Sequence, residues 1–295
     1  MTIRLTIGTS VPEPVVNLNS FTFNGGEESV RLDFPYCRGE EHFTITAALT
    51  TSAEIMQLAL ITDAIRRKCG KPNITLNMPY IPYARQDRVC NPGEALGIRV
   101  FCDMINAMQF DTVRVLMPHS DVASALLNNC DELRYEVNWE AFVESKISNT
   151  DRRSLTIVSP DAGAMKRTLK FAQNYNNKVT PFEPAHVIMA DKVRDVMTGQ
   201  ITSTVVHATR EQVEGETCLI YDDICDGGMT FIKLAEALRN LGAKKIILAV
   251  PHGIFSKGLI EIAKVIDQII TTNVFEDNMP EYRSIDVNIM NIGNI

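Results

Sequence analysis

The chain has 295 residues, of which 45% are hydrophobic and 22% charged, a composition that is typical of globular proteins and argues against long disorder. The length is enough for two ordinary domains. A formal net charge of -7 does not favour a nucleic-acid partner. No apolar run is long enough for a membrane span or a signal peptide, so neither nucleic acid nor a membrane is expected as a partner.

The hydrophobic pattern predicts helices that alternate with strands. A helix is expected at Ser52–Cys69, where Gly70 ends it. Strands are expected at Ile74–Met78, Val113–Met117, Leu155–Val158, Leu219–Tyr221 and Lys245–Val250, and a second helix from Phe231 to Leu241. This alternation predicts an α/β fold with mainly parallel sheets flanked by helices, in which ligands bind at the carboxyl ends of the strands. The polar stretch Asn128–Thr150 separates two α/β halves.

The seven cysteines are odd in number and scattered, and none forms a CxxC pair. This pattern predicts neither a zinc cluster nor a disulfide framework. Reduced thiols, as in a cytoplasmic protein, are the expectation.

The strongest local signal is the stretch Tyr221–Thr230. Asp222 and Asp223 follow a strand, and a turn with Gly227 and Gly228 opens a helix. Backbone N–H groups of such a turn bind anions, whereas carboxylates suit sugar hydroxyls or Mg²⁺. The stretch therefore predicts a sugar-phosphate site, with an ordinary acidic helix cap as the alternative.

A second signal is Tyr80–Arg88, which reads YIPYARQDR. Arg85 offers a planar cation for stacking on adenine or for binding phosphate, and Gln86 a paired donor and acceptor. These groups favour a nucleotide-binding loop over a proline-rich loop with solvated charges.

These stretches resemble motifs of one enzyme family. DDICDGGMT resembles the ribose-phosphate loop shared by type I phosphoribosyltransferases and PRPP synthetases, and YARQD resembles a signature of the PRPP synthetases alone. Weaker matches follow the order of that family: FNGGE at 23–27, LMPHS at 116–120, SPDAGAMKR at 159–167 and KVR at 192–194. The resemblance extends from about Leu5 to about Met290. It implies two similar type I phosphoribosyltransferase-like domains, an N-terminal PRPP synthetase-like domain at 1–137 and a C-terminal one at 138–295.

The resemblance also implies an activity, that of a ribose-phosphate diphosphokinase. Such an enzyme transfers the β,γ-diphosphate of ATP to the 1-hydroxyl of ribose 5-phosphate and releases AMP, with Mg²⁺ as cofactor. The loop at 23–27 completes a neighbouring subunit's adenine site in the family, so a cytoplasmic homo-oligomer, a dimer or hexamer, is expected.

The matching positions imply a role for each site residue. The catalytic cations are Lys192 and Arg194, the ATP-binding residues are Phe23, Glu27, Arg85, Gln86, Asp87 and His119, the sugar-phosphate residues are Asp222, Asp223, Asp226, Gly227, Gly228, Met229 and Thr230, and the metal ligands are His119 and Asp161. Lys166 and Arg167 open a helix, where a solvated face is the simplest interpretation.

Three positions depart from the family pattern. Met117 stands where the family has Asp, Met229 where it has Gly, and Gly227 where a Thr hydroxyl would hold the 5-phosphate. Gly227 removes one donor and opens space at that phosphate, so ADP-ribose, whose phosphate is esterified, is an alternative acceptor.

Two further alternatives are a phosphoribosyltransferase and a non-catalytic regulatory relative. The YARQD stretch argues against the first. The retained Lys192, Arg194, His119 and Asp161 argue against the second.

Overall fold

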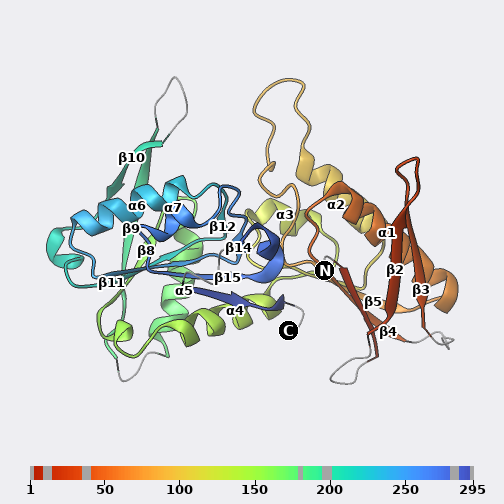
Figure 1. Cartoon of the computed structure of the whole chain (residues 1–295), viewed down its shortest axis with the longest axis horizontal. Helices are drawn as coiled ribbons and strands as arrows, with labels where there is room; N and C mark the ends of the chain where they lie inside the picture. The colour runs from red at the N-terminus through yellow and green to blue at the C-terminus, as the bar shows by residue number, and fades with distance from the viewer. Residues whose placement is uncertain are drawn as a thin grey trace. The chain divides into compact units, whose positions relative to one another are not determined.

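The computed structural model describes residues 3–8, 15–34, 41–178, 182–194, 201–279 and 286–292, with backbone alone at 133–136, 193–194, 201–203 and 276–277. The chain divides into two compact units, one of residues 1–136 with 292–295 and one of residues 137–291. Figure 1 shows the helices and strands of both units. No helix in the described ranges is long and apolar enough to cross a membrane.

The N-terminal unit is built on a five-stranded sheet with the order β1-β4-β5-β6-β7. Strand β1 pairs with β4 antiparallel, and the remaining pairs are parallel. A separate hairpin, β2–β3, packs along helix α1, where Gln57 donates to Glu28 over 2.6 Å. The elements are β1 (Ile3–Ile7), β2 (Asn17–Thr22), β3 (Glu28–Asp33), β4 (His42–Ala47), α1 (Ser52–Cys69), β5 (Asn73–Asn77), α2 (Gly97–Ala107), β6 (Thr112–Arg114), α3 (Asp121–Leu126) and β7 (Cys130–Asp131).

Helix α1 has the bounds that the sequence predicts, because both of its ends are encoded locally. Thr51 and Glu54 form a reciprocal capping box that satisfies backbone N–H groups of the first turn. Gly70 ends the helix with a φ of 73°, which costs little without a Cβ. Ile55, Leu58 and other apolar residues at helical spacing are buried in the core of the unit.

The C-terminal unit has a seven-stranded sheet with the order β10-β9-β8-β11-β13-β15-β16, parallel except for the β9–β10 pair. Helices α6 and α7 lie on one face of this sheet and α4 and α5 on the other (Figure 1). The helices are α4 (Leu133–Lys146), α5 (Met165–Asn176), α6 (Met229–Asn240) and α7 (Ile260–Ala263), with short 3-10 segments η1 (Asp151–Ser154), η2 (Arg210–Gln212) and η3 (Asn273–Asn278). The strands are β8 (Leu155–Ser159), β9 (His186–Arg194), β10 (Ile201–Val206), β11 (Thr217–Tyr221), β12 (Ile224–Cys225), β13 (Lys245–Ala249), β14 (His252–Gly253), β15 (Gln268–Thr272) and β16 (Val287–Met290).

These sheets confirm the predicted fold class. The structure differs from the sequence expectations in the end of one strand and in the state of one cysteine. The predicted strand Val113–Met117 ends at Arg114, because the chain turns out of the ladder and Met117 takes a φ of 41°. Cys69 is disulfide-bonded rather than reduced. The described cysteines at 90, 102, 130, 218 and 225 are free.

Candidate active site

The predicted sugar-phosphate and catalytic residues of the C-terminal unit gather at one edge of its sheet. Strands β8, β11 and β13 are parallel neighbours, so the loops that follow them leave the sheet at the same edge. Residues 160–164 follow β8, residues 222–228 follow β11, and residues 250–258 follow β13. The loops are short, and buried strands fix their ends.

Asp222 and Asp223 begin the loop after β11 and are bridged by one arginine. The Arg167 guanidinium on α5 donates through Nη1 to Asp222 Oδ1 over 2.7 Å and also to Asp223 Oδ1. The Asp223 backbone N–H donates to Asp222 Oδ1 over 2.8 Å. Asp222 is 7% exposed and Asp223 2%. Arg167 is therefore not part of a solvated helix face, as the sequence suggested, but the counter-ion of the carboxylate pair.

The electrostatics of this group follow from two acids that share one cation. Burial, and then the neighbouring Asp223, raise the pKa of Asp222 to about 8, because ionising both carboxyls would concentrate like charge in a dry site. Burial alone would lower the pKa of Arg167, but Asp223 and Asp222 outweigh it and raise the pKa. The cluster can present both a carboxylate and a protonated acid to sugar hydroxyls.

Asp161, in the loop after β8, pairs with Lys192 on β9. Lys192 Nζ contacts Asp161 Oδ2, and the Ala164 N–H donates to Asp161 Oδ1 over 2.9 Å. Burial acts to raise the pKa of Asp161, but the hydrogen bond and charge of Lys192 outweigh it and lower the pKa. The predicted catalytic lysine and one predicted metal ligand thus neutralise each other. The side chain of Arg194, the second predicted cation, lies outside the described residues.

The turn Asp226–Thr230 places backbone N–H groups at the start of α6. Gly228 is the residue before the helix, with a φ of 78°, and a Cβ there would lie 2.6 Å from Ile262 Cδ1, so glycine is required. No side chain caps this helix. Its first N–H groups are therefore available to an anion.

Lys257 is the side chain nearest to Gly227, at a distance that leaves room for a Cβ. A Cβ on Gly227 would meet Cδ and Cε of Lys257 at 3.5 Å. Ser256 Oγ donates to Asp226 Oδ1 over 2.6 Å and holds the Lys257 segment against the turn. Lys257 was not among the residues expected from the sequence, since no local motif marks it.

In the N-terminal unit the Tyr80–Arg88 loop follows β5 and folds back on α2. The Gln86 N–H donates to the Tyr83 carbonyl over 2.9 Å, and the Gln86 side chain lies where any Cβ on Gly97 would collide with it. Tyr83 takes a φ of 63°, and its ring lies tilted against that of Phe101 with the centroids 5.9 Å apart. Arg85 and Gln86 are consequently held in an exposed loop at the carboxyl end of β5.

Asp87 joins this loop to the segment that carries His119. A hydrogen bond from Arg88 Nε to Asp87 Oδ1 over 3.0 Å lowers the pKa of Asp87, and the charge of His119 acts in the same direction. The Leu116 N–H also donates to the Pro79 carbonyl over 2.9 Å. The structure therefore brings together Asp87 and His119, which the sequence places thirty-two positions apart.

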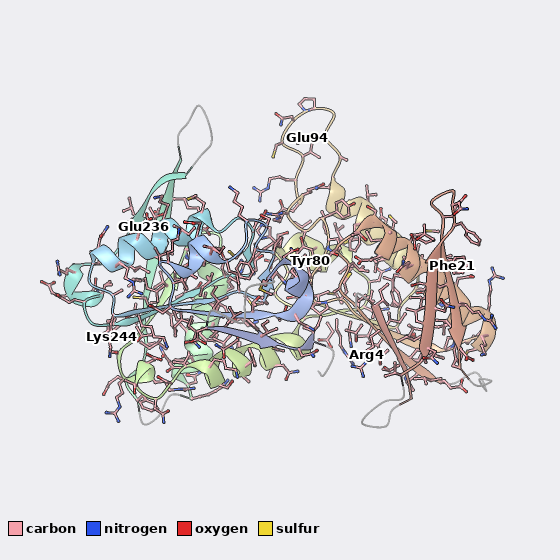
Figure 2. All side chains as sticks on the ribbon, viewed as in Figure 1. Arg4, Phe21, Tyr80, Glu94, Glu236 and Lys244 are labelled. Carbon is pink, nitrogen blue, oxygen red and sulfur yellow. The ribbon has the colours of Figure 1, made fainter. Side chains whose placement is uncertain are left out.

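Phe23 and Glu27 lie elsewhere in this unit, at the tip of the β2–β3 hairpin. The Phe23 N–H donates to the Glu27 carbonyl over 2.8 Å, and the Phe23 ring is 55% exposed. Figure 2 shows Phe21, on the same hairpin, in a different part of the unit from Tyr80. The hairpin tip is thus not assembled with the Tyr80–Arg88 loop within this unit.

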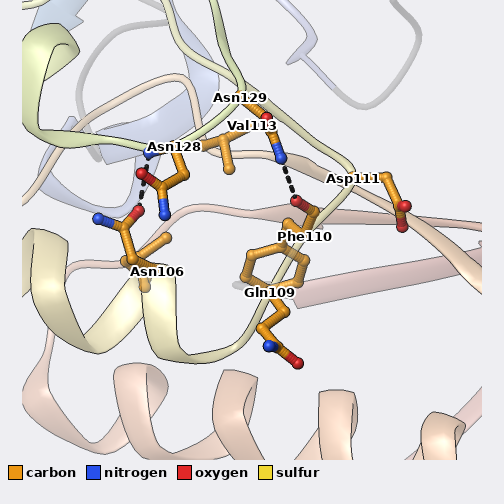
Figure 3. A pocket seen from close by; sticks show the side chains of 8 residues that line it. Asn106, Gln109, Phe110, Asp111, Val113, Asn128 and Asn129 are labelled. Atoms are coloured by element: carbon orange, nitrogen blue, oxygen red, sulfur yellow. Dashed lines mark hydrogen bonds between the residues drawn. The ribbon is translucent and has the colours of Figure 1, made fainter.

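Two other features of the described residues do not form a ligand site of their own. No group of three or more His, Cys, Asp or Glu side chains within the described ranges could by itself hold a metal. A pocket of about 330 Å³ lies where the chain enters β6 and β7, at the strand ends opposite the predicted loops (Figure 3). Its amides are used within the fold, since Asn106 accepts from the Asn128 N–H over 2.8 Å and Asn129 donates to the Phe110 carbonyl over 3.0 Å.

Comparisons with known proteins agree with this arrangement. Residues 4–108 match the family described as the N-terminal domain of ribose phosphate pyrophosphokinase, and residues 136–282 match the phosphoribosyl transferase domain. A ribose-phosphate pyrophosphokinase of Pyrococcus furiosus is 27% identical over 88% of this chain and 86% of its own length. One from Thermococcus kodakarensis is 29% identical over 85% and 83%. A crystal structure of a phosphoribosylpyrophosphate synthetase from Mycobacterium smegmatis shares the fold, with a TM-score of 0.74 at 22% identity over 95% of this chain and 87% of that one.

Proposed function

The chain belongs to the ribose-phosphate pyrophosphokinase (PRPP synthetase) family, and on this premise we propose that it transfers the β,γ-diphosphate of ATP to the 1-hydroxyl of ribose 5-phosphate, giving PRPP and AMP. The observation that carries the proposal is the edge of the C-terminal sheet. Two buried carboxylates there lead directly into an uncapped helix N-terminus. Carboxylates suit the sugar hydroxyls and the backbone N–H groups suit the 5-phosphate, in the order in which ribose 5-phosphate presents them.

Each unit has a distinct task in this proposal. The N-terminal unit holds ATP through Arg85, Gln86, Asp87 and His119, and the C-terminal unit holds the acceptor. Asp222 and Asp223 orient the 2- and 3-hydroxyls, and the turn from Asp226 to Thr230 binds the phosphate. Because the 1-hydroxyl attacks the β-phosphorus of ATP in one displacement, the protein has little covalent chemistry to perform and contributes alignment and charge neutralisation.

Lys192 is the described cation best suited to the transferring group. Its ammonium is held by Asp161 and is 19% exposed, so it is partly withdrawn from water beside the acceptor site. A preorganised cation in such a place stabilises the negative charge that moves during transfer. We assign the same role to Arg194, the next residue but one on β9.

Magnesium fits the donors that are present. Mg²⁺ is commonly held by one or two carboxylates together with substrate phosphates, so Asp161 would be a sufficient protein ligand in the C-terminal unit, and His119 is a separate candidate ligand in the N-terminal unit. When bound, the metal would neutralise the diphosphate and polarise it toward attack. Lys192 currently neutralises Asp161, so it would be free to contact the phosphates once a metal takes its place.

The competing acceptor, ADP-ribose, is not favoured by the residues at the turn. The relatives that the chain matches are ribose-phosphate pyrophosphokinases, and Lys257, the side chain nearest to Gly227, adds a cation that suits a terminal phosphate. A purely regulatory role is likewise not favoured, since Lys192 and Asp161 are both kept. The proposal therefore remains with ribose 5-phosphate.

We also propose a homo-oligomer of at least two chains. Phe23 and Glu27 lie on an exposed hairpin tip that is not assembled with the other nucleotide residues of its own unit. A second copy could use this tip to complete a nucleotide site. Light scattering at assay concentration should give a mass of at least two chains, and a fully active monomer would exclude the shared site.

One assay tests the function directly. Purified protein is incubated with Mg²⁺ and ATP, with ribose 5-phosphate, with ADP-ribose or without acceptor, and the products are identified by mass. We expect AMP and PRPP only with ribose 5-phosphate. ADP as the product would mean single phosphoryl transfer, and a diphosphorylated ADP-ribose would reassign the acceptor.

A further inference from the structure

Lys257 lies along the phosphate turn of the acceptor site without an assigned role. It belongs to the segment that follows β14, and this segment is tied to the turn at several points. Strand β14 pairs with β12, so Gly253 lies opposite Cys225. The Ile254 N–H donates to the Cys225 carbonyl over 2.8 Å. The position of Lys257 relative to the turn is therefore set by backbone pairing.

The side chain of Lys257 runs directly over Gly227. Its Cδ and Cε both lie 3.5 Å from the position of a Cβ on Gly227, and its Cγ lies at 3.8 Å. Nζ is one further bond away, about 1.5 Å. The ammonium is consequently within about 5 Å of the same point.

The charge of this lysine has no partner within the described residues. Lys257 is exposed and forms no ion pair or hydrogen bond there. By contrast, Lys233 and Lys264 in the same unit pair with Glu236 and Glu261. An unpaired ammonium beside uncapped helix N–H groups adds full positive charge to a place that already favours an anion.

From this geometry we propose that Lys257 binds the 5-phosphate of the acceptor and makes the site selective for a terminal phosphate dianion. The proposal rests on the proposed function, since it assigns that phosphate to the Asp226–Thr230 turn. In this arrangement the methylenes contact Gly227, and the ammonium adds a charged contact to those that the backbone N–H groups make with the phosphate oxygens. A terminal dianion gains more from this cation than an esterified monoanion does.

The phosphate is remote from the reacting 1-hydroxyl, which sets the expected kinetics. When a contact is made equally in the ground state and the transition state, its loss raises KM and leaves kcat unchanged. Charge-assisted hydrogen bonds are worth about 1.5–3 kcal/mol when fully formed, and exposure of this lysine places it at the lower end. We therefore expect a roughly tenfold rise in KM for ribose 5-phosphate.

The test uses Lys257→Met, which keeps the apolar stem and removes the charge. KM for ribose 5-phosphate should rise roughly tenfold, while kcat and KM for ATP stay within about twofold. Lys257→Arg should retain most of the affinity because it retains a cation. The matched control is Lys264→Met, at a paired and exposed lysine directly after α7, and this variant should behave as the parent protein.

A second measurement does not depend on turnover. Titration calorimetry with ribose 5-phosphate in the absence of ATP should show the same roughly tenfold loss of affinity in Lys257→Met. Inorganic phosphate should also bind this variant less tightly than it binds the parent protein. If the parent protein releases AMP with ribose 5-phosphate but Lys257→Met binds it unchanged, the role of Lys257 is refuted and the proposed function stands. If the parent protein gives no acceptor-dependent AMP, the proposed function itself fails.

Discussion

Replacing Asp222 by Asn should make the protein more stable at alkaline pH while weakening acceptor binding. Asp222 is buried beside Asp223, and its pKa is raised to about 8 from an ordinary value of 3.8. Between these values the folded state holds a proton that the unfolded state has released. Stability is therefore lost as the pH rises from about 4 towards 8.

The magnitude follows from the pKa shift. Each pH unit in this window is worth up to about 1.4 kcal/mol, so the parent protein loses roughly 4 kcal/mol of unfolding free energy between pH 5 and pH 8 on account of this group. An Asn at 222 resembles the protonated acid, since its carbonyl oxygen can still accept from Arg167 and from the Asp223 N–H. The variant should escape most of the loss.

The assay is thermal unfolding of both proteins at pH 5 and pH 8. We expect similar Tm values at pH 5 and a variant that is higher by roughly 10 °C at pH 8, since 1 kcal/mol shifts Tm by about 2–4 °C in a domain of this size. Asp161→Asn is the matched control. The pKa of Asp161 is lowered, so its contribution is lost only as the pH falls below about 4, and its variant should be equally destabilised at pH 5 and pH 8. A difference between Asp222→Asn and the parent that stays constant with pH would refute the reasoning.

Two further predictions address the catalytic cation and the nucleotide loop. Lys192→Ala should lower kcat by roughly 10² or more, with little change in ATP affinity, because a preorganised charge at the transition state is worth a few kcal/mol. Steady-state kinetics measure both quantities. An unchanged kcat would mean that Lys192 only pairs with Asp161 and has no catalytic role. Gly97→Ala should raise KM for ATP several-fold with little change in Tm, because its Cβ would displace the flexible end of Gln86. The double variant with Gln86→Ala should then be no worse than Gln86→Ala alone, and additive effects would show that Gly97 acts by another route.

The sequence by itself determined the features that are encoded by neighbouring residues. The bounds of α1 follow from Thr51, Glu54 and Gly70, and the mainly parallel sheets follow from alternating apolar segments. The family was recognisable because its motifs are short contiguous stretches, each placed directly after a strand. The assignment of individual site residues remains a prediction drawn from those motifs.

Only the tertiary structure decided which charges meet. Arg167 lies fifty-five positions before Asp222 and reads locally as one more charged residue at the start of a helix. Lys257 lies thirty positions after Gly227 and has no motif of its own. Both come to the acceptor site because β8, β11 and β13 are adjacent in the sheet, and the order of parallel strands is set by long-range packing rather than by local sequence. The same packing excludes water from Asp222, and that exclusion raises its pKa.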